Sequence, residues 1–150
     1  AGVARTHRFR LRIIGAGQAR LSVPGLEVEH MAWNLAREPA DFASFDIGLY
    51  PLPDDPWANG KSALKSVQYL ASGVPYVASP IGAAATVGIA GTTHLLATGT
   101  EAWIAALSGL LDDPGTRAEM GRHGRCHALQ HHTIDVGARL LGDVLRRVAP

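Results

Sequence analysis

Two lysines stand near the start of a segment that otherwise has the pattern of a buried helix, NGKSALKSVQYLASGVP at residues 59–75. A cation is mildly unfavourable in the first turn of a helix, because the unpaired N–H groups there carry a partial positive charge. A bound anion would reverse that effect. At helical spacing, one narrow stripe opposite the apolar face carries the polar residues Lys61, Lys65, Gln68 and Ser72. Small residues beside the stripe leave the first amides approachable: Gly60, Ser62 and Ala63. The pattern favours an anion site over a solvated lysine face.

A second glycine-rich stretch, IIGAGQAR at residues 13–20, has part of the pattern of a dinucleotide-binding turn. Arg20 stands where the third glycine belongs, and Pro24 and Gly25 follow too soon for the helix that would hold a pyrophosphate. We therefore expect a glycine turn that ends a strand, and no nicotinamide or flavin site.

Two further groups of polar residues favour ordinary structural roles. His123, His127 and His131 recur every four residues, but no carboxylate or thiol pattern completes a metal site, so surface histidines are the preferred interpretation. Asp54 and Asp55 stand among prolines in YPLPDDPW, where turn formation explains them better than acid–base catalysis does. We expect no bound metal.

The elements that would position these residues alternate along the chain, as in an α/β protein. We expect strands at 9–14, 27–31, 46–50, 75–79 and 94–97, and helices at 60–72, 101–111, 114–130 and 134–148. The expected caps are Asn59, Thr100, Asp113 and Thr133 at the helix starts and Gly73 as the stop of the first helix. Strands with little polar content separated by helices predict a parallel sheet covered by helices.

Composition excludes several classes of protein. The net charge of +1 predicts no nucleic-acid partner, and the alternation of Arg8, Arg10 and Arg12 with apolar residues is typical of a strand with one solvated face. The run without charges from Ser66 to Thr100 is interrupted by two prolines and five glycines, so it predicts buried strands and no membrane span. The single Cys126 and the absence of a signal peptide predict a cytoplasmic protein.

The segment DIGLYPLPDDPWANGKSALKSVQYLASGVPYVASPIG resembles the donor-binding half of family 4 glycosyltransferases. In that family a helix-borne motif precedes a strand of the form G-x-P-V-V-A-S-x-x-G. The similarity continues through TEAWIAALSGLLDDPGTRAEMGRHGR and so covers most of the chain after residue 10. The resemblance implies a GT-B enzyme built from two Rossmann-like domains. Residues 1–150 would be the C-terminal, nucleotide-sugar-binding domain, without its first strand and helix and without the N-terminal acceptor domain.

The resemblance also implies roles for individual residues. In the broader family two glutamates eight positions apart contact the donor sugar and the ribose, and Gly60 and Gln68 occupy those positions here. A subgroup carries G-K-x-x-x-K-x-x-Q-Y, which this chain matches with Gly60, Lys61, Lys65, Gln68 and Tyr69. Ala84 and Thr86 stand where relatives often have Asn and Glu, which leaves the phosphate- and sugar-facing loop around Gly82 poorer in polar groups and puts activity in doubt.

The chemistry implied is a retaining transfer of a hexosyl group from a nucleoside diphosphate sugar to an acceptor hydroxyl, with no obligatory metal and no other cofactor. Lys61, Lys65 and the helix N-terminus would stabilise the leaving diphosphate, Gly60, Ser62 and Gly82 would contact phosphate and sugar, and Gln68 the ribose. Trp33 and Asn34 would contact the base, although a core or turn role is equally open for each.

Membrane association would be possible only through the absent domain. Alone, the chain is expected to transfer no sugar. The alternative is a non-catalytic, flavodoxin-like or regulatory α/β binding module.

Overall fold

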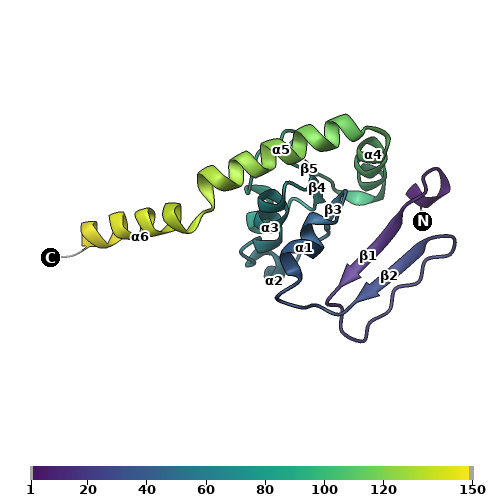
Figure 1. Ribbon diagram of the computed structural model, residues 1–150, viewed down its shortest axis with the longest axis horizontal. Helices are drawn as coiled ribbons and strands as arrows, with labels where there is room; N and C mark the ends of the chain where they lie inside the picture. The colour runs from purple at the N-terminus through teal and green to yellow at the C-terminus, as the bar shows by residue number, and fades with distance from the viewer. Residues whose placement is uncertain (1, 149–150) are drawn as a thin grey trace.

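The computed structural model describes residues 2–148, in which all strand pairing is parallel (Figure 1). The strands are β1 (Arg10–Ile14), β2 (Glu27–Met31), β3 (Gly48–Tyr50), β4 (Tyr76–Ala78) and β5 (Leu95–Leu96). The helices are α1 (Glu38–Ala43), α2 (Pro56–Asn59), α3 (Leu64–Ser72), α4 (Gly99–Asp112), α5 (Pro114–His131) and α6 (Ile134–Val148). Two 3₁₀ turns are added, η1 (Val3–Arg5) and η2 (Gly82–Ala85). The predicted α/β class with parallel strands covered by helices is confirmed.

The sheet is divided into two parts: β3, β4 and β5 pair in that order, and β1 pairs with β2 alone. Of the three arginines expected on a solvated strand face, Arg10 and Arg12 lie on β1, whereas Arg8 precedes the strand. The two pair across to β2, with Arg10 Nε 2.6 Å from Glu27 Oε1 and Arg12 Nε 2.8 Å from Glu29 Oε2. Residues 15–26, between the two strands, contain no helix, which confirms the glycine turn expected after β1.

A cavity of about 650 Å³ lies between the two parts of the sheet. One wall is the chain from Arg8 to Arg12, and the opposite wall includes Asp46, Ile47 and Leu49. In Figure 1, β1 is the strand of its pair that lies nearer to the rest of the molecule. Both β1 and β3 are edge strands, so their unpaired backbone groups border this cavity.

Aromatic rings fill the core between β4 and the helices. Tyr69 of α3 stacks on Tyr76 of β4 with ring centroids 5.5 Å apart, and Tyr76 stacks on His94 at 4.8 Å. Phe42 of α1 meets Tyr69 edge-on at 5.1 Å. These rings are buried with Leu70, whose exposed fraction is 0%. The core therefore fixes α3 against both α1 and β4.

The long helices agree with the expected spans, but the start of α3 does not. Asp113 caps α5 by accepting a hydrogen bond from the Thr116 N–H at 2.9 Å, as expected, while the N-cap of α4 is Thr98 and not Thr100. α6 begins at Ile134 as expected, none of its residues is buried, and the helix projects from the body (Figure 1).

The expected helix over 60–72 begins only at Leu64, and Asn59 is the last residue of α2 and not an N-cap. The reason is a short helix that the sequence interpretation missed. Asp55 accepts a hydrogen bond from the Ala58 N–H at 2.7 Å, and Pro56 occupies the first position of α2. The chain then passes through Ala63, whose φ of 54° interrupts the helical path. Lys61 therefore lies in a loop and not on the helical stripe.

Candidate functional site

The N-terminus of α3 lies in the region where an anion site was expected. Its N-cap residue, Ala63, makes no side-chain hydrogen bond to the first turn. The Ser66 N–H donates to the Ala63 carbonyl at 2.9 Å, whereas the Leu64 and Lys65 N–H groups have no hydrogen-bond partner among residues 2–148. Lys61 and Ser62 are exposed in the loop just before the helix, and Lys65 belongs to its first turn. Positive charge and approachable N–H groups are therefore concentrated at one helix end.

Lys65 belongs to a network that joins α3 to the segment after β2. Its Nζ donates to Gln68 Oε1 at 2.9 Å and lies 3.6 Å from Glu38 Oε1. Trp33 Nε1 donates to the same Glu38 oxygen at 2.9 Å. The ammonium also stands over the Phe42 ring, 5.1 Å from its centroid. Three predicted site residues, Trp33, Lys65 and Gln68, thus meet around Glu38, which the sequence interpretation did not include.

The sequence offers one signal for Glu38, which is its position five residues after Trp33. Nothing else in AREPADF, residues 36–42, distinguishes it from a surface glutamate. Its pKa is lowered, first because the Trp33 indole donates to the carboxylate and then because the Lys65 ammonium is near, although desolvation acts in the opposite direction. The carboxylate is therefore ionised at neutral pH.

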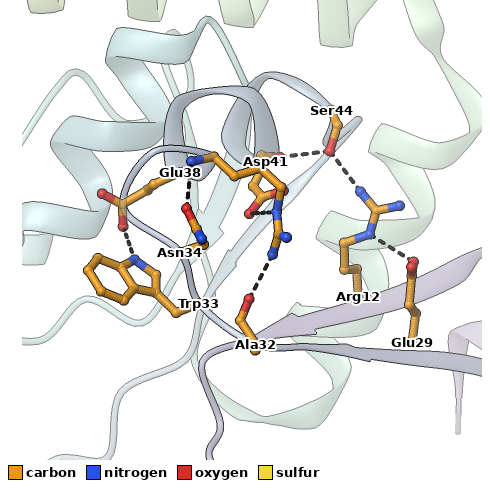
Figure 2. A network of polar contacts seen from close by, with 9 residues as sticks. Arg12, Glu29, Ala32, Trp33, Asn34, Glu38, Asp41 and Ser44 are labelled. Atoms are coloured by element: carbon orange, nitrogen blue, oxygen red, sulfur yellow. Dashed lines mark hydrogen bonds and ion pairs between the residues drawn. The ribbon is translucent and has the colours of Figure 1, made fainter.

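The segment that carries Trp33 and Glu38 is held by its own polar contacts (Figure 2). Arg37 donates to the carboxylate of the buried Asp41 at 2.9 Å and to the Ala32 carbonyl at 2.7 Å. The Arg37 N–H donates to Asn34 Oδ1 at 3.2 Å, and Arg12 ties Ser44 to Glu29 of β2. Asn34 thus has a turn role, whereas the Trp33 side chain is 53% exposed and is not part of the core.

Gly82 brings the loop after β4 against the end of α2. Its φ is +52°, and a Cβ there would lie 2.5 Å from the Asn59 carbonyl oxygen, so only glycine fits this position. The loops that contain Gly82 and Lys61 are therefore neighbours through Asn59. Gly60 is different, because its φ is −82° and an added Cβ would lie 3.6 Å from the nearest atom, an ordinary contact.

The carboxyl ends of β3, β4 and β5 open on a second cavity, of about 820 Å³. Its walls include residues 51–54 after β3, 79–81 after β4 and 97–100 after β5. The Leu52 N–H donates to Ser79 Oγ at 3.0 Å and holds the first two loops together. Ligands of open α/β sheets bind at such carboxyl ends. Neither Lys61 nor Trp33 lines this cavity, and neither does any other residue of the network around Glu38.

The other polar groups noted in the sequence have structural surroundings. Asp55 is the cap of α2, and Asp54 accepts a hydrogen bond from Asn59 Nδ2 at 3.0 Å. The rings of His127 and His131 lie 4.5 Å apart, but within residues 2–148 no group of three or more His, Cys, Asp or Glu is arranged to hold a metal ion. Over the same residues, no helix has the length and apolar character needed to cross a membrane.

These features define a class of fold: an α/β domain of parallel strands covered by helices, as in the C-terminal domain of GT-B glycosyltransferases. Residues 2–141 match the family model described as glycosyl transferase-like. The chain belongs to this family. No curated protein matches the chain in sequence.

Solved structures show the same fold. Sucrose-phosphate synthase from Thermosynechococcus elongatus superimposes with a TM-score of 0.79 and 20% identity, over 98% of this chain and 40% of the synthase chain. Anabaena HepE, solved in complex with UDP, superimposes with a TM-score of 0.65 and 16% identity, over 81% of this chain and 33% of that chain. HepE in complex with UDP-glucose superimposes with a TM-score of 0.65 and 18% identity, over 81% of this chain and 33% of the HepE chain. The chain thus spans well under half of each of these proteins.

Proposed function

We propose that this chain is the donor-binding domain of a retaining glycosyltransferase of family 4, which transfers a hexosyl group from a nucleoside diphosphate sugar to an acceptor hydroxyl. One observation carries the proposal: α3 begins without a side-chain cap, beside two lysines, next to the loops that follow β3 and β4. Membership of the glycosyl transferase-like family supports it, as do the nucleotides bound in the HepE structures.

In the proposed reaction, negative charge develops on the diphosphate as the bond to the sugar breaks. Lys61, Lys65 and the amides at the start of α3 would stabilise that charge, so the reaction has no obligatory metal and no cofactor other than the donor. Ser62 and the backbone at Gly60 and Gly82 would contact the phosphate and the sugar.

The nucleoside would lie on the other side of Lys65. Gln68 would bind the ribose, and Trp33 would offer its exposed ring to the base. Asn34 uses its Oδ1 to cap the turn before α1, so its amide nitrogen would be the group that contacts the base.

We also propose that the acceptor domain, and the first strand and helix of this domain, belong to the same polypeptide. The cavity between β1 and β3 supports this, because two edge strands border a space into which one more strand would fit. Hydrogen exchange provides a test: the amide of Leu49, which faces the unpaired edge of β3, should exchange slowly in the full-length protein and at least tenfold faster in residues 1–150 alone. Equal protection would contradict this domain organisation. The location proposed is the cytoplasm, consistent with a single unpaired Cys126.

Calorimetric titration with UDP, GDP, ADP and UDP-glucose tests the proposed function. A nucleoside diphosphate should bind residues 1–150 with roughly millimolar affinity and the full-length protein more tightly, because part of the site lies outside this chain. The chain alone should transfer no sugar, since the acceptor site and one wall of the cleft are absent. If none of these nucleotides binds the full-length protein at several millimolar, the proposed function is wrong. Binding without transfer by the full-length protein would favour the non-catalytic binding module.

A further inference from the structure

We propose that Glu38 binds the ribose of the donor nucleotide, accepting hydrogen bonds from its 2′- and 3′-hydroxyl groups. The inference rests on the proposed function and adds a residue that the motif around α3 does not contain. Glu38 belongs to α1, outside that motif, and contacts the motif through its ion pair with Lys65.

The position of the Glu38 carboxylate allows this role. Its side chain is 21% exposed, so it is partly shielded but still reachable from solvent. The contacts with Trp33 and Lys65 both involve Oε1, and no hydrogen bond of Oε2 is found among residues 2–148, although the Gln68 amide also lies near the carboxylate. These two contacts fix the carboxylate before a ligand arrives, so binding does not need to order it.

The chemistry of the neighbours matches the order of groups in a nucleotide. Trp33 offers an exposed aromatic face, on which a base can stack. Lys65 and the start of α3 offer positive charge for the phosphates. Glu38 lies between them, in contact with both, where the ribose would be. A carboxylate is the usual acceptor for ribose hydroxyls, and the charged acceptor gives stronger hydrogen bonds than the amide of Gln68.

Glu38 is ionised at neutral pH, which suits an acceptor of two hydroxyl hydrogens. Its pKa is lowered mainly by the hydrogen bond from the Trp33 indole and further by Lys65. A purely structural role, in which Glu38 only orients Trp33 and Lys65, would require the same contacts. The two roles differ in one respect: only a ribose-binding residue distinguishes a nucleotide with the hydroxyl groups from one without them.

The experiment compares ribonucleotides and deoxynucleotides in the full-length protein. The tightest binder among UDP, GDP and ADP is titrated beside its 2′-deoxy and 3′-deoxy analogues, against the wild type, Glu38→Gln and a control, Glu101→Gln. The control changes an exposed glutamate in the first turn of α4. The wild type and the control should bind each deoxy analogue about tenfold more weakly than the ribonucleotide, since a hydrogen bond to a charged group is lost. Glu38→Gln should bind the ribonucleotide about tenfold more weakly and the deoxy analogues nearly unchanged.

Two results with these nucleotides would overturn the inference while leaving the proposed function in place. One is equal binding of ribonucleotide and deoxynucleotides by the wild type, and the other is an equal loss for all three ligands in Glu38→Gln. Inorganic pyrophosphate, which has no ribose, is the second probe: its affinity should not fall in Glu38→Gln, and a fall would show that Glu38 acts only by positioning Lys65. If no nucleoside diphosphate binds, the proposed function fails and this inference fails with it.

Discussion

The Lys65 ammonium lies 3.6 Å from a carboxylate oxygen of Glu38, a residue of a different helix. This ion pair, with the hydrogen bond to Gln68, holds Lys65 towards α1. Lys61 makes no side-chain hydrogen bond or ion pair to any of residues 2–148, and it lies in the loop that adjoins Gly82 through Asn59. The two lysines that the sequence places on one stripe are therefore not equivalent in the structure.

The first prediction rests on the proposed reaction and separates the two lysines by mutation of the full-length protein. Lys61→Ala should lower kcat more than it weakens diphosphate binding, because the charge on the leaving group is greatest in the transition state. Lys65→Ala should have the same kind of effect but a smaller one, since the Lys65 charge is partly balanced by Glu38. Steady-state kinetics and calorimetry with UDP provide the measurement. If Lys61→Ala leaves both turnover and UDP affinity unchanged, the lysines are only a solvated surface.

The second prediction compares two glycines of the candidate site, of which only Gly82 has a backbone conformation and close neighbours that exclude other residues. Gly60→Glu should change the free energy of unfolding by no more than about 0.5 kcal/mol, because the backbone there is right-handed and a Cβ meets only ordinary contacts. Gly82→Ala should cost roughly 2 kcal/mol or more, because a Cβ would lie 2.5 Å from the Asn59 carbonyl oxygen at a positive φ. Urea denaturation of both variants measures the difference. A large cost for Gly60→Glu would show that the glycine is structural and not a replaced glutamate.

Much of the fold follows from patterns that act over short distances. Asp113 before Pro114 gives the start of α5, and Gly73 gives the end of α3, since caps depend on a few neighbouring residues. The same reasoning failed at Asn59, where a better cap four residues earlier, Asp55, started α2 instead. Helix α1 was missed because its six residues have no clear apolar period, and its position depends on Phe42 packing against Tyr69.

The candidate site likewise combines residues that a local sequence pattern identifies with residues that only tertiary packing brings in. Lys61, Lys65 and Gln68 could be identified because they share one short motif. Glu38 could not, because its relation to Lys65 arises only when α1 packs beside α3. Gln68 lies next to Lys65 by helical spacing, whereas the contact of Trp33 with the site depends on Glu38.

The third prediction compares two glycines in helices. Gly73 ends α3 with a φ of +69°, and Gly73→Ala should cost about 1 kcal/mol even though space for the methyl group exists. Gly109 lies within α4, where an added Cβ meets nothing within 4 Å, so Gly109→Ala should stabilise the protein by roughly 0.5–1 kcal/mol. Thermal unfolding of the two variants should shift Tm in opposite directions. Shifts of the same sign would contradict the helix boundaries described here.

The fourth prediction is a loss of stability in mild acid that comes from His94. Its ring is 1% exposed, stacks on Tyr76, and has a buried Nε2 without a hydrogen-bond partner within the described residues. Burial, and to a lesser extent the charge of nearby His127, lowers the pKa of His94 from 6.5 to about 4. Between these two values the unfolded chain binds a proton that the folded chain does not, so the free energy of unfolding falls as the pH falls from about 6.5 to about 4.

The size of this loss, and its assignment to His94, can be measured with one variant. The shift corresponds to roughly 3 kcal/mol at most, and we expect a measured loss of at least about 1 kcal/mol. In His94→Phe the ring still stacks on Tyr76, but it cannot be protonated and it loses the 3.0 Å hydrogen bond between Thr93 Oγ1 and Nδ1. Urea denaturation at pH 8 gives the packing cost of the substitution, and the same measurement at pH 4.5 should show a difference smaller by about 1 kcal/mol or more. An equal difference at the two pH values would show that His94 is protonated as readily in the folded protein as in the unfolded chain, and acid instability would then have to arise from other groups.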